Sequence, residues 1–196
     1  KSGGTVVKNV TGYDLSKLIT GSFGTLVALT EITLKVLPKK KLSNTIIIHT
    51  ENRKLINELF EKISSSSSEI SGAVFIPEEP EDENYDHNKE KVFKFNDLEA
   101  KGSFLALRVE GEKISINEKI KALSDELELD KLNSTILDVY QSTPFWKKIN
   151  NLELFKATKN NLLRVVIPPS KGNKLMQYLG NKYKYYIDWC GALYWI

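Results

Sequence analysis

From residue 44 onward the chain alternates between strand-type and helix-type segments, and this alternation restricts the folds open to it. β-Branched and other apolar residues form short runs at 44–50, 70–77, 103–111 and 134–140. Amphipathic segments at 51–63 and 113–129 lie between them. The order strand-helix-strand, repeated once, predicts an α+β domain of the ferredoxin-like type, with helices on one face of an antiparallel sheet.

The last third of the sequence predicts further elements of the same kinds. A strand is expected at 161–169, a helix at 170–180 and a pair of aromatic strands at 183–196. Another helix is expected at 143–152, with Pro144 near its start, where a helix needs no amide donor. The acidic segment at 78–91 is expected to form an exposed loop.

Residues 1–38 are expected to belong to a different domain from residues 42–196, with the solvated lysine run at 39–41 as the linker. A short strand is predicted at 5–10. A second strand is predicted at 28–37, where apolar and polar side chains alternate until Pro38.

Composition excludes several classes of protein. The chain has 196 residues, of which 41% are hydrophobic, and its net charge of +3 gives no basis for nucleic-acid binding. No apolar run is long enough to cross a bilayer. Cys190 is the only cysteine, so an internal disulfide is impossible and a reducing, cytoplasmic location is expected. The chain begins at Lys1 and ends on apolar aromatic residues, so we interpret it as an internal piece of a longer protein.

A short helix is predicted between the first two strands, and the turn after it is rich in glycine and hydroxyl residues. Thr11 or Asp14 can cap the helix, and Gly21 lies where a left-handed residue would end it. The following residues, GSFGT at 21–25, can present successive backbone amides to an anion, for which phosphate is the natural candidate. Taken alone, the pattern favours a tight connection without a ligand, because short Gly/Ser loops are common.

Other side chains with chemical potential give weaker signals. Neither His49 nor His87 has a cysteine or an acid at metal-ligand spacing, so no metal site is expected. Nothing places a base beside Cys190, which favours a spectator thiol. Arg164 interrupts an apolar strand, so it either points outward at a sheet edge or meets an anion.

Three segments together resemble a known family of flavoproteins. They are VKNVTGYDLSKL with the following GS-GTL and LTE-TLKVLP patterns (7–38), PFWKKINNLELF with LLRVVIPP (144–155 and 162–169), and DWCGALYW (188–195). They are similar to flavoproteins of the vanillyl-alcohol-oxidase type, which have a PCMH-type FAD-binding domain. Within these, the match is closest to the FAD-binding E subunits of bacterial glycolate oxidase.

The resemblance implies a cofactor and a division into domains. Residues 1–38 would be the C-terminal part of the PCMH-type FAD-binding domain, and 42–196 a ferredoxin-like cap domain. The implied FAD-facing residues are Gly12, Gly21, Ser22, Gly24 and Thr25, with Leu26 and Ala28 acting through their backbone. Two departures are evident: Val27 replaces the usual glycine, and the Gly-rich loop that wraps the FAD pyrophosphate is missing.

The implied activity is oxidation of glycolate to glyoxylate in a complex with a D-type flavoprotein and an F-type iron–sulfur subunit. No side chain is identified as the general base. One alternative is an FAD-dependent oxidoreductase for another 2-hydroxy acid, such as lactate. A second is a non-catalytic subunit-docking module that uses clustered aromatic residues. These residues are Trp146, Phe155, Tyr185, Tyr186, Trp189, Tyr194 and Trp195.

Overall fold

The computed structural model describes residues 12–78, 94–95, 98–99, 102–156, 161–180 and 182–196. The chain divides into two units, Lys1–Lys39 and Lys40–Ile196. The strand predicted at 5–10, most of the acidic segment and His87 lie outside the described residues.

The described part of the first unit contains one regular element, the short helix α1 (Leu15–Ile19). The strand predicted at 28–37 is wrong, because these residues adopt extended but unpaired backbone. A strand needs a hydrogen-bonded neighbour, and the described residues of this unit provide none.

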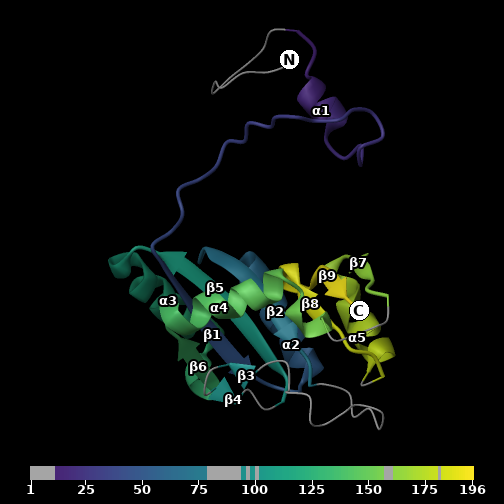
Figure 1. Ribbon diagram of the computed structural model, residues 1–196. Coiled ribbons are helices and arrows are strands. Elements are labelled where there is room, and N and C mark those ends of the chain that lie inside the picture. The colour runs from purple at the N-terminus through teal and green to yellow at the C-terminus, as the bar shows by residue number, and fades with distance from the viewer. Residues whose placement is uncertain (1–11, 79–93, 96–97, 100–101, 157–160, 181) are drawn as a thin grey trace. The chain divides into compact units, whose positions relative to one another are not determined.

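The second unit is built on a seven-stranded antiparallel sheet (Figure 1). Its strands are β1 (Leu42–His49), β2 (Ile70–Ile76), β5 (Phe104–Gly111), β6 (Ser134–Leu137), β7 (Arg164–Val166), β8 (Tyr186–Asp188) and β9 (Leu193–Trp195), in the spatial order β6-β1-β5-β2-β8-β9-β7. A separate pair is formed by β3 (Lys94–Phe95) and β4 (Leu98–Glu99). The predicted α+β class is therefore correct.

Four of these strands and two helices form a split β-α-β arrangement. Helix α2 (Arg53–Ser65) connects β1 to β2, and α3 (Lys113–Leu127) connects β5 to β6. The spatial order β6-β1-β5-β2 places β5 between the two strands that α2 joins, and β1 between the two that α3 joins. This is the β-α-β-β-α-β topology expected from the alternation in the sequence.

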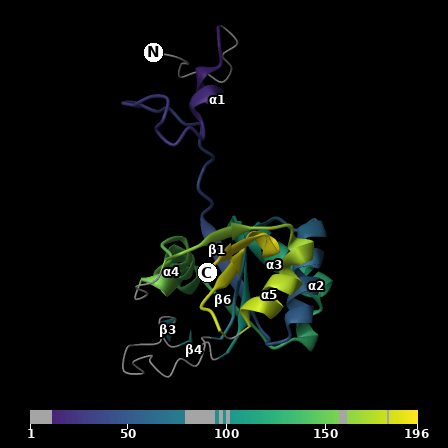
Figure 2. The ribbon, with the colours of Figure 1, turned by 90° about the vertical axis from the view of Figure 1, so that its right-hand side faces the viewer.

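Helices cover both faces of the sheet, so the prediction of one covered face is wrong (Figure 2). Ile46 and Ile48 pack with α2, α3 and α5 (Gly172–Leu179) on one side. Ile47, between them, packs with α4 (Val139–Asn150) on the other. Successive strand residues point to opposite faces, so three consecutive buried isoleucines require cover on both.

Helix α4 begins earlier than expected. The Asp138 carboxylate accepts hydrogen bonds from the backbone amides of Tyr140 (2.9 Å) and Gln141 (3.0 Å), and the Gln141 side chain accepts one from the Asp138 amide (3.4 Å). This capping box ends β6 at Leu137, whereas the sequence predicted strand up to residue 140. Pro144 consequently lies inside the helix rather than near its start.

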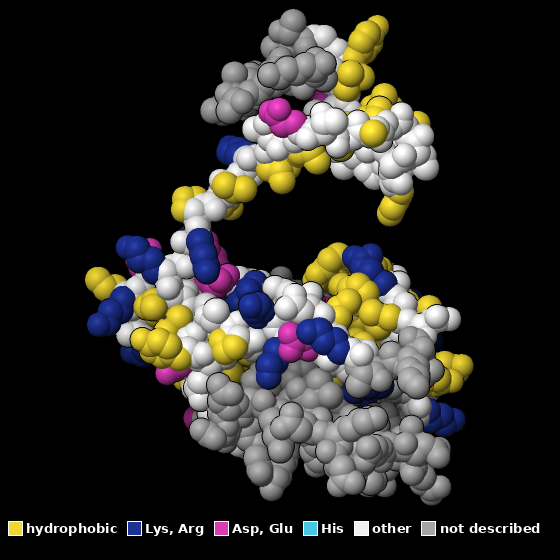
Figure 3. Space-filling view, viewed as in Figure 1, with side chains coloured by type: hydrophobic (Ala, Val, Ile, Leu, Met, Phe, Trp, Pro, Cys, Tyr) yellow, Lys and Arg dark blue, Asp and Glu magenta, His cyan; other side chains and the backbone are white. Residues whose placement is uncertain are grey.

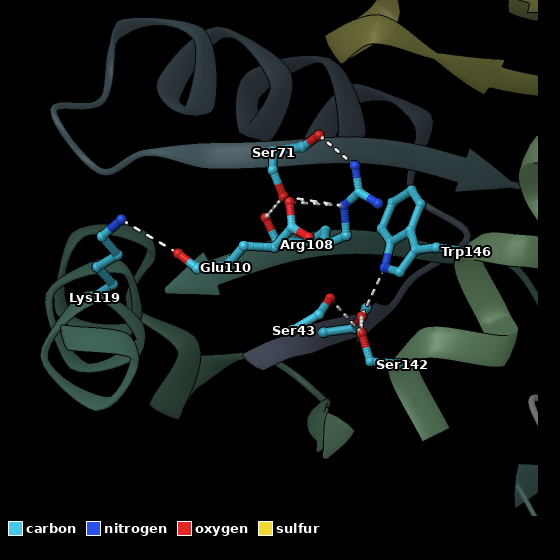
Figure 4. A network of polar contacts seen from close by, with 8 residues as sticks. Ser43, Ser71, Arg108, Glu110, Lys119, Ser142 and Trp146 are labelled. Carbon is cyan, nitrogen blue, oxygen red and sulfur yellow. Dashed lines mark hydrogen bonds and ion pairs between the residues drawn. The ribbon is translucent and has the colours of Figure 1, made fainter. Parts of the chain in front are cut away.

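A buried hydroxyl network attaches α4 to the sheet (Figure 4). The indole Nε1–H of Trp146 donates to Thr45 Oγ1 at 2.8 Å. Thr45 Oγ1 also lies 2.7 Å from Ser142 Oγ, which lies 3.1 Å from Ser43 Oγ. Thr45 and Ser142 are fully buried, so these bonds satisfy polar atoms that water does not reach.

Replacing Thr45 with valine is expected to destabilise the protein by about 1–3 kcal/mol, because the buried Trp146 N–H loses its acceptor without any change in shape. Urea denaturation measures the free energy of unfolding. Thr135→Val on the exposed face of β6 is the matched control and is expected to change stability by about 0.5 kcal/mol or less. An equal loss of unfolding free energy in Thr45→Val and Thr135→Val would contradict the claim that the hydroxyl network stabilises the protein.

Candidate functional site

Helix α1 is capped by Asp14, one of the two residues predicted for that role. Its Oδ1 accepts a hydrogen bond from the Lys17 amide at 3.2 Å, and its Oδ2 lies 3.2 Å from Lys17 Nζ. The hydrogen bond from the Lys17 backbone amide is the main cause that lowers the pKa of Asp14 below its usual value. The bond from the Lys17 ammonium is the second cause. The other predicted cap, Thr11, lies outside the described residues.

The turn after α1 has the left-handed backbone that its glycines predicted. Gly21 and Gly24 have φ values of 82° and 76°, and Phe23 between them has a φ of 51°. The Ser22 amide donates to the Ile19 carbonyl at 3.1 Å, and the Thr25 amide and hydroxyl both donate to the Ser22 carbonyl, at 3.0 and 2.7 Å. These bonds close the turn using its own backbone.

Three amides of this turn have no acceptor. Within the part of the chain that the structure describes, the N–H groups of Gly21, Phe23 and Gly24 donate to no protein atom. A Cβ placed on Gly21 or Gly24 would meet no described atom within 4 Å, so the space beside both backbones is open. Gly12, with a φ of 80°, has the same open surroundings. Such a backbone can approach a ligand closely and bind its oxygen atoms.

The turn is followed by apolar side chains that the described residues of the same unit leave exposed (Figure 3). Phe23 is 99% exposed, and Leu26 and Val27 remain 58% and 43% exposed. Exposed apolar side chains continue through the rest of the segment at Leu29, Ile32, Leu34, Val36 and Leu37. Exposed apolar side chains repeated over a segment of this length mark a surface that other groups cover.

The described ionisable side chains of the second unit form no recognisable metal or nucleophile site. No cluster of His, Cys, Asp and Glu suited to a metal occurs among the described residues. Cys190 is half-buried, and burial raises the pKa of its thiol, which favours the unreactive protonated form. A shallow hollow between α2 and the end of α3 is lined by Leu55, Leu59 and the Glu128–Lys131 ion pair, which offer no nucleophile.

Most of the aromatic residues considered for subunit docking belong to the core. The buried ones are Trp146, Phe155, Tyr185, Tyr186 and Tyr194. Trp195 is partly buried, and Trp189 is 55% exposed. The aromatic cluster is therefore mainly core packing, and Trp189 is the member that remains on the surface.

Arg164 points outward from the edge strand β7, which agrees with one of its two predicted alternatives. Its guanidinium lies over the indole of Trp189. The sequence did not predict this contact, because the two residues are far apart along the chain. The pairing of β7 with β9 brings them together.

No helix among the described residues is both long and apolar enough to cross a bilayer.

Comparison with known proteins finds several relatives, although no protein-family profile matches the chain. The sequence is 27% identical to the glycolate oxidase subunit GlcE of Escherichia coli K12 over 195 residues, 99% of this chain and 43% of that protein. It is 35% identical to the glycolate oxidase subunit GlcD of Bacillus subtilis over 77 residues, 39% of this chain and 15% of that protein. It is 50% identical to a D-lactate dehydrogenase of Anaerostipes hadrus over 52 residues, 26% of this chain and 11% of that protein.

The chain thus spans less than half the length of each of these relatives.

Cys190 is expected to react slowly with a thiol reagent at pH 8, because its raised pKa leaves less thiolate and burial restricts access. Unfolding in urea removes both effects and is expected to raise the rate by roughly tenfold or more. The absorbance of the released reagent anion follows the reaction. Equal rates in native and unfolded protein would show that the thiol is neither buried nor perturbed.

Proposed function

Since the chain is related to glycolate oxidase subunits, and to the E subunit over almost its whole length, we propose that it is the FAD-binding subunit of a 2-hydroxy acid oxidoreductase. Residues 1–38 are the last part of a PCMH-type FAD-binding domain, and residues 42–196 are a ferredoxin-like cap domain. The favoured substrate is glycolate, which is oxidised to glyoxylate. The D-type flavoprotein and the F-type iron–sulfur protein are the proposed partners.

The observation that carries this proposal is the group of unpartnered amides at Gly21, Phe23 and Gly24. Neighbouring N–H groups without a described acceptor, with open space beside Gly21 and Gly24, suit the oxygen atoms of a phosphate or of a flavin ring. In this proposal Ser22 and Thr25 shape the turn, and Gly12, Leu26 and Ala28 line the cofactor with their backbone. The side chain of Val27, which stands where the resemblance expects glycine, is 43% exposed.

The uncovered apolar segment after the turn supports the same proposal. Apolar side chains at Ile32, Leu34 and Val36 alternate with polar ones, as in a strand that buries one face. In the proposed FAD-binding domain the remaining strands supply both the missing hydrogen bonds and the missing cover. The isolated segment lacks them, which accounts for its extended, unpaired backbone.

FAD would supply the chemistry, because it can accept a hydride, which carries two electrons, from the α-carbon of a 2-hydroxy acid while the hydroxyl proton leaves to solvent or a base. The residues of this chain hold and orient it through backbone amides, and the apolar residues nearby exclude water. No described side chain is assigned as a general base.

Gly21→Ala in the full-length protein is expected to weaken FAD binding by about tenfold or more, because the methyl group occupies the open space and strains a left-handed backbone. Gly102→Ala is the matched control. Gly102 has nearly the same φ, 81° against 82°, and an added Cβ there would make only an ordinary contact with the Glu51 carboxylate at 3.8 Å, but it belongs to the second unit. Both changes are expected to cost about 1–2 kcal/mol of stability.

Flavin absorbance of the purified proteins and titration of the apoproteins with FAD measure the difference. Retention of FAD by Gly21→Ala at the level of Gly102→Ala would contradict the assigned role of the turn. A wild-type full-length protein that is colourless and indifferent to FAD would overturn the proposed function itself.

The choice of substrate has a separate test. Anaerobic addition of glycolate to the flavin-loaded complex is expected to bleach the flavin faster than addition of D-lactate at equal concentration. Faster bleaching by D-lactate would assign the alternative substrate.

A further inference from the structure

Arg164 lies on a part of the sheet that none of the described helices covers on the α4 side. Helix α4 packs on that face over residues of β1, β2 and β5, including Ile47, Val74 and Ala106. Farther along the sheet, Arg164 of β7 pairs with Trp195 of β9, and the next outward residue of β7, Val166, is 54% exposed. In the space-filling view, hydrophobic side chains gather beside basic ones over β9 and β7 (Figure 3).

Two indoles hold the guanidinium of Arg164. Its Cζ lies 5.0 Å from the ring centroid of Trp189 and 5.9 Å from that of Trp195, both within the range of a cation–π interaction. These contacts occupy the face of the guanidinium and leave its N–H groups, which lie in the plane, free to donate.

A second arginine of the same unit shows what a purely structural Arg–Trp stack looks like here (Figure 4). The Cζ of Arg108 lies 4.9 Å from the Trp146 ring, and Arg108 also donates to the Oγ and carbonyl oxygen of Ser71 at 3.0 and 2.9 Å. Glu110 adds an ion pair at 3.7 Å.

Arg164 differs in this respect. Within the described ranges, no hydrogen-bond acceptor and no carboxylate partners it. Stacking on the two indoles fixes the position of the Arg164 guanidinium, while its N–H groups donate to no described acceptor.

The turn that presents Trp189 is strained. Trp189, Cys190 and Gly191 have consecutive positive φ values of 52°, 50° and 92°. A glycine adopts this conformation freely, but two side-chain-bearing residues do not. The Asp188 carboxylate supports the turn by accepting the Trp189 amide at 2.7 Å, and Gly191 packs closely on Phe60. Strain of this kind persists where the surrounding structure enforces it, typically at sites of function.

Charge in this region favours an anionic ligand. Residues 161–196 contain five basic residues, Arg164, Lys171, Lys174, Lys182 and Lys184, and one acidic residue, Asp188. This segment therefore carries a net positive charge, a sign that favours small anions.

We propose that Arg164, held on Trp189 and Trp195, recognises the carboxylate of a small 2-hydroxy acid. This inference rests on the proposed function, because a carboxylate is the group that all 2-hydroxy acids share. A guanidinium edge binds a carboxylate through two parallel N–H···O bonds, and the indoles restrict it to one orientation. An exposed ion pair alone contributes little, so the site becomes effective when another surface covers the apolar side chains around it.

The test uses the full-length, flavin-loaded protein and the variants Arg164→Met, Arg164→Lys and Trp189→Phe. Oxalate, a dicarboxylate that does not donate a hydride, is titrated while the flavin absorbance is followed. Arg164→Met is expected to raise the Kd of oxalate and the KM of glycolate by about 10- to 100-fold, with kcat changed much less. Arg164→Lys is expected to raise the Kd of oxalate less than Arg164→Met does. Lysine keeps the positive charge but cannot donate two parallel hydrogen bonds to one carboxylate.

Arg108→Lys is the matched control, since it alters the other Arg–Trp stack. It is expected to lower the melting temperature and leave the Kd of oxalate unchanged. Trp189→Phe keeps an aromatic face and is expected to raise the Kd of oxalate by a few-fold. If Arg164→Met fails to fold, the Lys and Phe variants carry the comparison.

Unchanged oxalate binding and unchanged KM in flavin-loaded Arg164→Met would overturn this inference and leave the proposed function intact. Loss of a partner subunit with oxalate binding unchanged would also overturn it, since the surface would then be a protein contact. Absence of flavin from the wild-type protein would instead refute the proposed function.

Discussion

The second unit depends on the need to bury both faces of one antiparallel sheet. Three consecutive isoleucines of β1, Ile46 to Ile48, are buried, and the strand turns them to opposite sides. The face of Ile46 and Ile48 is covered by α2, α3 and α5, while α4 covers Ile47 and is attached through the Trp146–Thr45 bond. Because α4 leaves the β9–β7 end of its face open, Arg164 and Trp189 remain exposed at that end.

The first unit does not bury the apolar side chains of its extended segment. Its apolar side chains alternate as they would in a half-buried strand, yet no described residue covers them or pairs with their backbone. The turn before them closes on its own carbonyls and still leaves the amides of Gly21, Phe23 and Gly24 without acceptors. One proposal accounts for both features: a flavin binds the amides, and the rest of an FAD-binding domain covers the apolar side chains.

Local signals predicted the structure correctly at α1 but not at the start of α4, and features that depend on tertiary contacts were not predicted. Asp14 and Gly21 bound α1 as predicted, because a cap and a left-handed glycine act within one turn of helix. The strand at 28–37 was predicted wrongly. Alternating apolar and polar residues indicate that one face of a strand is suited to burial, but they do not show whether a neighbouring strand is present to pair with it. The sequence did not predict that α4 covers the Ile47 face of the sheet. Which helix packs on which face is decided by tertiary contacts and not by the pattern within the helix. Pro144 was misplaced because the capping box at Asp138, a local signal, was overlooked. The pairing of Arg164 with Trp189 had no local signal at all.

The central claim is that the backbone of the turn after α1 binds FAD, and amide hydrogen exchange on the full-length protein tests it most directly. The account predicts that peptides containing Gly21, Phe23 and Gly24 exchange rapidly in the apoprotein and slow markedly when FAD is added. Exchange in this turn that is the same with and without saturating FAD would contradict it, because amides bonded to a cofactor cannot exchange as freely as amides facing water.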